Sequence, residues 1–518
     1  MCHIKYPIGI QTFSKIIRGG YAYVDKTSFI PVLLESGQYI FLSRPRRFGK
    51  SLLLSMLHSY FEGDRELFRG LAIDSMDVDW TPRPVIHIDL NSENYTKEDG
   101  LENRLDASLK IYEEKYGIQA IKKTPALRFE DIIRYASEGD EASCVILIDE
   151  YDKPLFSLDV DSELFKENQA LLKSFYGVLK SMDRYIRFAM LTGVARFSKV
   201  SIFSDLNNLR DISFEERFAA ICGITSDELD RYFHSGVEAM AEKEGVSYEE
   251  VRVQLKRAYD GYHFAKVSPD IFNPFSLINV FGKQEFGSYW FETGTPSYLV
   301  RLVELEEWPL RGLAPTEIEA KQLEASGLLS RDPVPAFYQT GYLTIKAYDP
   351  LFKTYTLDYP NEEVRDGFVS FLIPYYIKPE RRGERFSIKE CVIAVQIGRP
   401  MEFMELLESM IAGIPYSEKG SAEDHFQNAT YILFTLMGHY VLLEDRTSDG
   451  RIDLTVETSQ YVYIFEFKVD STAEAAMEQI HRKRYWLKYG GSGKVIYLIG
   501  ANFNTKTKRL DPPLIEKM

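Results

Sequence analysis

Residues suited to phosphate chemistry lie in the stretch FLSRPRRFGKSLLL, Phe41 to Leu54. An apolar, strand-like run enters a loop that holds Gly49, Lys50 and Ser51, and a helical pattern follows. Backbone N–H groups at the start of a helix bind anions, a lysine there reaches the β- and γ-phosphates, and a serine hydroxyl ligates Mg²⁺. The stretch therefore predicts a phosphate-binding loop. Its expected nucleotide-binding residues are Arg47, Phe48, Gly49, Lys50, Ser51 and Leu52.

The loop departs from the usual pattern G-x-x-x-x-G-K-[S/T] at one position, because Arg44 stands where the first glycine would be. A bare G-K-S occurs often by chance, so a capped helix after a basic turn is the alternative. The stretch SCVILIDEYDKPL favours the nucleotide interpretation, because a buried strand that ends in two carboxylates is costly without charged partners. Asp149 is expected to hold Mg²⁺ through water together with Ser51, and Glu150 to polarise the attacking water.

Two further polar residues follow a later apolar strand, Arg187 to Gly193. Thr192 at its end suits a sensor of the γ-phosphate, although it could equally be a turn residue that ends the strand. Arg196 could stabilise transition-state charge, either within its own chain or from a neighbouring subunit of a homo-oligomer. A plain surface arginine is the alternative for Arg196.

The strands expected at residues 38–42, 84–90, 144–149, 187–192 and 218–222 alternate with helices and are apolar throughout. This pattern predicts an α/β protein with a parallel sheet covered on both faces, as in a P-loop NTPase core. The segment before the first strand touches adenine in many ATPases. The lead-in containing Tyr21–Thr27 is therefore expected, as a whole, to lie near the adenine.

A second group of chemically capable residues lies near the C-terminus, on strands expected at 440–444, 451–457 and 461–468. Alternation along a strand puts Glu466 and Lys468 on one face, and Asp453 on the neighbouring strand can lie beside Glu466. Two carboxylates hold Mg²⁺, which activates water against a phosphodiester, and the lysine orients that water or stabilises the transition state. A salt bridge on an exposed hairpin is the alternative.

Neighbouring elements could complete this C-terminal site. Glu423 near the start of the helix 421–439 could add a metal ligand, and Gln479 on the helix 473–489 would face the site from the other side. The basic run 481–484 could meet backbone phosphates or could be a solvated helix face. The turn 448–450 would join the first two strands.

Composition limits the classes of protein. The 518 residues have a formal net charge of −15, so a protein that coats nucleic acid everywhere is excluded and any DNA contact would be local. Four scattered cysteines favour a reducing compartment. Neither a signal peptide nor an apolar run of about 20 residues is found, so we expect a cytoplasmic protein without a membrane-spanning segment.

The motifs together resemble the AAA-ATPase-like domain proteins that carry a PD-(D/E)XK nuclease domain. The N-terminal matches are YVDKT, RPRRFGKS, LIDEYDKPL, TGVARFSKVSIF, YDGYHF, NPFS, QTGYLTI and PNEEVR, and the C-terminal matches are GRIDL, IFEFK and AEAAMEQIHRKRY. The resemblance covers nearly the whole chain and accounts for the arginine-rich loop. It implies ATP and Mg²⁺ at Gly49, Lys50, Ser51 and Asp149, with Glu150 as base, and a nuclease site at Asp453, Glu466 and Lys468.

The expected organisation is a P-loop domain at 1–224, a helical lid at 225–310, a connector at 311–384 and a restriction-endonuclease-like α/β domain at 385–518. The connector is either winged-helix-like or a plain bridging domain, with a hairpin formed by 338–345 and 354–357. The leading hypothesis is an ATPase coupled to DNA cleavage, in mobile-element or phage defence. The alternatives are a nucleotide-regulated switch with a silent nuclease fold, and a protein in which only the ATPase is active.

Overall fold

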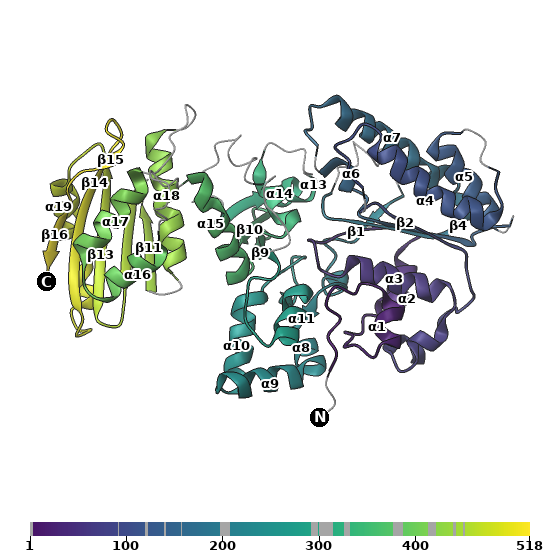
Figure 1. Cartoon of the computed structure of the whole chain (residues 1–518), viewed down its shortest axis with the longest axis horizontal. Helices are drawn as coiled ribbons and strands as arrows, with labels where there is room; N and C mark the ends of the chain where they lie inside the picture. The colour runs from purple at the N-terminus through teal and green to yellow at the C-terminus, as the bar shows by residue number, and fades with distance from the viewer. Residues whose placement is uncertain are drawn as a thin grey trace. The chain divides into compact units, whose positions relative to one another are not determined.

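A computed structural model gives the fold, and two compact units make up the chain (Figure 1). The first contains Met1–Leu302 and Ala314–Arg365, and the second contains Val303–Leu313 and Asp366–Met518. The structure describes all residues except 1–3, 92, 120–122, 139–140, 157, 197–207, 292–298, 300–313, 326–331, 377–386, 413–420, 439–441 and 449–450. Within described elements, the side chains of residues 325, 373–376, 442–448, 451–453 and 485 are also left out.

The first unit is built on a parallel sheet of five strands in the order β2-β3-β4-β1-β5. Helices α4, α5 and α7 cover one face and α1 to α3 the other (Figure 1). Every residue of β1 and β3 is buried, as expected for apolar strands between two helical layers. The predicted α/β class is thus confirmed. The strands are β1 Tyr39–Ser43, β2 Val85–Asp89, β3 Cys144–Asp149, β4 Ile186–Gly193 and β5 Arg210–Asp211; the helices are α1 Phe13–Arg18, α2 Phe29–Ser36, α3 Lys50–Phe61, α4 Gly100–Tyr116, α5 Pro125–Ala136, α6 Lys153–Phe156 and α7 Glu163–Ser181.

The strand predicted at 218–222 is wrong, because the fifth strand is the short β5 and this run forms turns. Backbone groups in this run and directly after it bond to the phosphate loop and to the lead-in segment instead of to a sheet. The Phe218 carbonyl accepts from Arg44, the Ala220 carbonyl accepts from Lys26, and the Gly223 N–H donates to the Phe48 carbonyl. A short buried apolar run looks the same in sequence whether its partners are strands or side chains.

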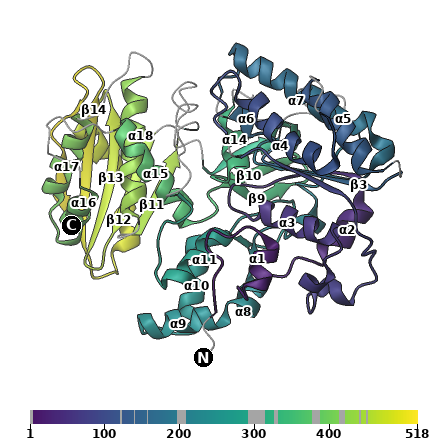
Figure 2. The ribbon, with the colours of Figure 1, turned by 45° about the vertical axis from the view of Figure 1, so that its right-hand side comes forward.

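Four helices form the region that follows the sheet and lie together in Figure 2. Capping boxes begin two of them, at Thr225 with Glu228 and at Ser247 with Glu250. Their apolar faces pack into one core. The elements are α8 Ser226–Tyr232, α9 His234–Glu244, α10 Tyr248–Tyr259 and α11 Pro274–Lys283, with the short strands β6 Ile224–Thr225 and β7 Ile271–Phe272.

The connector holds a small antiparallel sheet in the order β8-β10-β9. The hairpin expected from 338–345 and 354–357 is only partly right, because residues 338–340 complete a helix and Gly341, with φ of 90°, ends it. All eight residues of this helix are buried. The elements are β8 Thr316–Glu319, α13 Ala320–Ala325, α14 Pro333–Thr340, β9 Thr344–Asp349, β10 Thr354–Asp358 and α15 Glu362–Tyr376.

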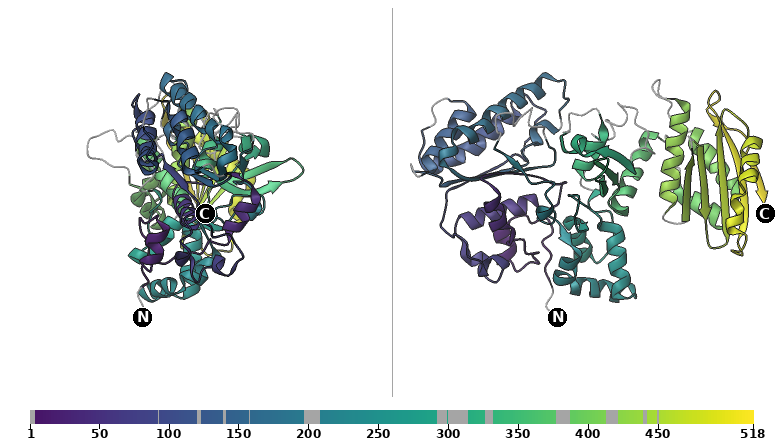
Figure 3. Two further views of the ribbon diagram at one scale, coloured as in Figure 1. Left: turned by 90° about the vertical axis from the view of Figure 1, so that its right-hand side faces the viewer. Right: turned by 180° about the vertical axis from the view of Figure 1, so that it is seen from behind.

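The second unit has a mixed sheet in the order β11-β12-β13-β14-β15, with β16 paired to β14. Helix α19 connects the parallel pair β13 and β14, and Figure 3 shows this sheet in yellow and yellow-green with helices against it. The helix predicted at 473–489 ends early, at Lys483, because Arg484 adopts φ of 51° and a 3₁₀ turn follows. The elements are α16 Ile388–Gln396, α17 Pro400–Ala412, α18 Ala422–Met437, β11 Leu442–Ser448, β12 Arg451–Glu457, β13 Tyr461–Val469, α19 Ala473–Lys483, β14 Val495–Asn504, β15 Arg509–Leu510 and β16 Leu514–Lys517.

Residues 440–441 of the first strand predicted for this sheet lie outside the described residues, and the described strand begins at Leu442. Residues 449–450 of the predicted turn lie outside the described residues, while Ser448 pairs with Arg451 as a tight hairpin requires. Among the helices of the described parts, none combines the length and the apolar character needed to cross a membrane.

Candidate functional site

The phosphate loop runs from the end of β1 to the start of α3. Gly49 caps the helix with φ of 95°, a conformation that side-chain-bearing residues rarely adopt. Lys50 follows as the first helical residue and is 3% exposed. Its ammonium donates to the carbonyls of Arg44 at 3.1 Å and Pro45 at 3.2 Å. The loop therefore curls around the lysine, with the N–H groups at the start of α3 beside it.

Arg44, which replaces the expected glycine, is a buried structural anchor. Its guanidinium donates to the carbonyls of Ser43, Ser213 and Phe218, each at 2.9 Å. It also lies 4.3 Å from the centre of the Phe264 ring. Burial lowers the pKa of this guanidinium. The departure from the usual motif thus places an arginine behind the loop, where a glycine would leave three buried carbonyls without these donors.

The acidic pair lies at the same edge of the sheet. The Glu150 carboxylate is 3.8 Å from the Lys50 ammonium. Asp149 is buried, and its Oδ1 accepts a 2.6 Å hydrogen bond from the Thr192 hydroxyl. The ends of β1, β3 and β4 therefore bring together Lys50, Asp149, Glu150 and Thr192, which lie far apart in the sequence.

Arg196 lies on the loop after β4. Its Nε donates to Asp211 Oδ2 at 2.8 Å, and its guanidinium lies 4.7 Å from the centre of the Phe214 ring. Its backbone N–H donates to the side chain of Gln339 on α14. The charge of Arg196 is therefore paired with Asp211, and its contact with a nucleotide stays a prediction.

Asp152 is a residue that the sequence reasoning missed. It is buried, and its Oδ2 accepts from the N–H groups of Val194 at 3.0 Å and Ala195 at 2.5 Å. Burial, with a further contribution from Glu150, raises its pKa to about 6. Asp152 thus ties the turn after the acidic strand to the turn that carries Arg196. The signal was the third acid in DEYD, which is hard to pair in an apolar surrounding.

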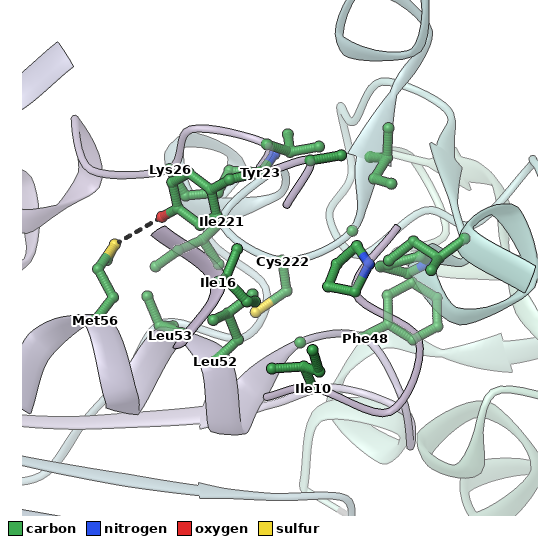
Figure 4. Close-up of a pocket in the computed structure, with 18 of the residues that line it drawn as sticks. Ile10, Ile16, Tyr23, Lys26, Phe48, Leu52, Leu53, Met56, Ile221 and Cys222 are labelled. Carbon is green, nitrogen blue, oxygen red and sulfur yellow. Dashed lines mark hydrogen bonds between the residues drawn. The ribbon is translucent and has the colours of Figure 1, made fainter. Parts of the chain in front are cut away.

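A cavity of about 470 Å³ opens beside these residues. Its wall includes Lys50, Ser51, Glu150, Lys153 and Asn91 on the polar side. A smaller apolar pocket of about 100 Å³ lies next to it and shares part of its wall (Figure 4). The shared residues are Pro7, Ile10, Gly49, Leu52, Pro274 and Ile278.

The lead-in segment lines this apolar pocket, as Figure 4 shows for Tyr23 and Lys26. The Tyr23 hydroxyl points to the sulfur of Met56 at 3.3 Å, and Lys26 pairs with Glu228 at 2.6 Å. Phe48, Leu52 and Cys222 also line the pocket and are labelled there. Aromatic and aliphatic walls with few polar groups are typical of a pocket for a flat apolar group such as a nucleobase.

The combined cavities fit a nucleoside triphosphate with Mg²⁺. The larger one offers an ammonium, a hydroxyl and the start of a helix to the phosphates, and the smaller one offers an apolar wall to a base. Among the described residues, no group of three or more His, Cys, Asp or Glu could hold a metal ion. Mg²⁺ commonly takes only one or two protein carboxylates together with phosphates and water, so Ser51 and Asp149 suit it.

The C-terminal constellation is centred on β13. Glu466 is fully buried, and its Oε1 accepts from the Lys468 ammonium at 2.7 Å. The same ammonium donates to the Gln479 side chain on α19 at 2.6 Å. Asp453 on β12 is the direct backbone partner of Glu466, although its side chain lies outside the described residues. Because Glu466 is buried, a salt bridge on an exposed hairpin does not describe this pair.

A pocket of about 780 Å³ lies next to β13 and is lined by Glu423, Lys468, Gln479, Glu478 and Arg482, among others. Three of the predicted site residues, from α18, β13 and α19, thus face one cavity. Glu423 accepts from the Gln427 amide at 3.0 Å. In the basic run, Arg482 lines the pocket, whereas His481 pairs with Glu516 at 2.8 Å.

The N-terminal and C-terminal regions each match the model of a known protein family. The family model described as predicted AAA-ATPase, AAA-ATPase-like, matches residues 7–203, and the PD-(D/E)XK nuclease superfamily model matches residues 421–511. A protein of Azotobacter chroococcum mcd 1, described as an uncharacterized protein in the vnfD 5′ region, is 36% identical over 529 residues. The match covers 100% of each chain.

Proposed function

The chain belongs to the same family as its Azotobacter chroococcum relative and contains an AAA-ATPase-like domain and a PD-(D/E)XK nuclease superfamily domain, and from this we propose that it hydrolyses ATP and cleaves DNA. The observation that carries the proposal is the 3.8 Å approach of Lys50 to Glu150 beside the 470 Å³ cavity. A lysine at the start of a helix and a carboxylate just after a buried strand are among the groups that phosphoryl transfer to water uses.

Each residue of the nucleotide site has a distinct role in this proposal. The N–H groups at the start of α3 and the Lys50 ammonium bind the β- and γ-phosphates. Ser51 and Asp149 would hold Mg²⁺, which would neutralise phosphate charge. Glu150 orients the attacking water, and Thr192 keeps the Asp149 carboxylate in place through their hydrogen bond. The apolar pocket beside Leu52 takes the adenine base.

The second unit provides the nuclease site. Asp453 and Glu466 would hold Mg²⁺, which would supply an activated water by lowering its pKa. Lys468, fixed between Glu466 and Gln479, donates to the water or to the phosphate. Glu423, which also lines the pocket, adds a carboxylate, and Arg482 in the same lining attracts the DNA backbone. The proposal places this activity in the cytoplasm, in defence against mobile elements or phage.

The experiment is a plasmid-cleavage assay with the purified full chain, with Mg²⁺ or Mn²⁺, and with or without ATP. Phosphate release is measured in the same samples. We expect ATP hydrolysis and metal-dependent cutting, with the first lost in Lys50→Ala and the second in Asp453→Ala. Lys110→Ala, at an exposed lysine of α4, is the control. Hydrolysis by Lys50→Ala at the wild-type rate would contradict the assignment of this loop as the phosphate-binding loop.

A plasmid that stays intact while ATP is bound and hydrolysed would favour the alternative function. The protein would then be a nucleotide-regulated switch with a silent nuclease fold, assembling as a homo-oligomer in which Arg196 could act on a neighbouring copy. Sedimentation with and without ATP measures that assembly.

A further inference from the structure

The phosphate loop is held from outside by the lid and the connector. The Arg47 guanidinium lies 3.9 Å from the centre of the Phe275 ring on α11. The Arg46 carbonyl accepts a 3.1 Å hydrogen bond from the Trp290 indole N–H. Gly341 lies so close to Pro45 that an added Cβ would be 2.7 Å from the proline ring. Phe48 and Arg44 are likewise covered, by the rings of Tyr262 and Phe264.

One of these contacts continues to the start of α15. The Trp290 backbone N–H donates to Glu363 Oε1 at 2.8 Å, and the Ser276 hydroxyl donates to Glu363 Oε2 at 2.7 Å. Glu363 is 5% exposed, and Trp290 is also 5% exposed. A buried carboxylate that loses its donors pays a large desolvation cost, so Glu363 follows Trp290 when Trp290 moves. We call the hydrogen-bonded series from Arg46 through Trp290 to Glu363 the latch.

Helix α15 extends beyond the unit that holds the latch. The division between the two compact units falls inside it, after Arg365, so its first turn belongs to the ATPase-like unit and the rest to the unit with the nuclease-like domain. The first turn is fixed by Asn361, whose side chain accepts from the Val364 N–H and donates to the Asp260 carbonyl. Helix α15 is continuous from Glu362 to Tyr376, so its backbone joins Glu363 to residues 366–376.

Binding of a γ-phosphate would change the hydrogen bonds inside the phosphate loop. The Lys50 ammonium donates to the carbonyls of Arg44 and Pro45, immediately before Arg46. A γ-phosphate bound by Lys50 competes for the same ammonium protons, and the carbonyls that lose them are free to turn. The Arg46 carbonyl lies next in the chain and is the acceptor of the latch.

We propose that the latch transmits the nucleotide state of the phosphate loop to the second unit through α15. This inference rests on the proposed function, since it names the regulation of the same site. A two-state element is required for such coupling, and the element here is the hydrogen bond between Arg46 and Trp290, which is made in one state and broken in the other.

The test is hydrogen exchange of the full chain with and without a non-hydrolysable ATP analogue and Mg²⁺. In the wild type we expect the rate of amide hydrogen exchange at residues 366–376 to change by about tenfold when the analogue binds. Trp290→Phe keeps an aromatic ring but removes the indole N–H, so the change at these residues should be lost while the analogue still binds. Trp80→Phe, in an aromatic cluster with Tyr60 and Phe68, is the control and should behave as wild type.

Ser276→Ala, which removes a single donor to Glu363, is the second variant and guards against a folding defect in the first. It should weaken the change at 366–376. Binding of the analogue without any change at 366–376 in the wild type, or an undiminished change in both variants, would overturn this inference alone. A wild-type chain that does not bind the analogue would overturn the proposed function as well, and a fluorescence titration of binding separates the two failures.

Discussion

The Lys50 ammonium lies 3.8 Å from the Glu150 carboxylate although β4 separates their strands in the sheet. The pair therefore spans the end of β4, where Thr192 donates to Asp149. This places the cation, both acids and the hydroxyl at one edge, which is where ligands bind in open parallel sheets.

Glu150→Gln should separate binding from hydrolysis. The amide keeps the size of the side chain but cannot accept a proton from water, so we expect hydrolysis to fall by about a hundredfold or more. Binding should persist, because Lys50 and the start of α3 are unchanged. Phosphate release and titration with a fluorescent ATP analogue measure the two effects. Glu163→Gln, at an exposed glutamate on α7, is the matched control, and equal losses of hydrolysis in both variants would contradict the role of Glu150.

Arg44→Gly should destabilise the protein, although it restores the glycine of the usual motif. The substitution removes three hydrogen bonds to buried carbonyls and the contact with Phe264, which together predict a loss of about 3 kcal/mol or more. Thermal and urea unfolding measure it. Arg69→Gly, at an exposed arginine beyond α3, should have a much smaller effect. A variant as stable as wild type would show that the buried guanidinium is not an anchor.

Asp152→Asn should change how stability depends on pH. Burial raises the pKa of Asp152 from 3.8 to about 6, so the folded protein binds this proton more tightly than the unfolded chain. Its contribution to stability is therefore present below pH 4 and is lost as pH rises to 6, by about 3 kcal/mol in total. Asparagine does not titrate, so the stability of the variant relative to wild type should rise over this range.

Urea unfolding of both proteins at pH 4 and pH 7 tests this difference. The comparison between two proteins removes the effects of other titrating groups. A difference that stays constant across the range would show that Asp152 titrates normally in the folded chain.

Lys468→Met should abolish DNA cutting and also destabilise the second unit, because it leaves the buried Glu466 carboxylate without its cation. We expect a loss of about 3 kcal/mol. The double variant Glu466→Gln with Lys468→Met should recover most of this stability but no cutting. Urea unfolding and plasmid cleavage provide the two measurements. Cutting by the double variant would show that neither side chain is part of the nuclease site.

The sequence determined the α/β class and most of the strands. Continuous apolar runs between helices predicted β1 to β4, and turn and capping signals predicted the start of α8. The same reasoning failed at 218–222, because an apolar run in the sequence does not show which groups will donate hydrogen bonds to its backbone carbonyls. It also missed that residues 338–340 are the end of helix α14, where tertiary burial outweighs local preference.

Sequence motifs determined which residues are chemically capable, among them Lys50, Asp149 and Glu466, because a charged side chain within or beside a buried apolar run is costly without a partner. Only the tertiary structure decided that Arg44 faces away from the cavity, that Asp152 joins two turns, and that Trp290 connects the phosphate loop to Glu363. Each of these depends on contacts between segments distant in the chain. Such contacts are set by how whole elements pack, and no local spacing encodes them.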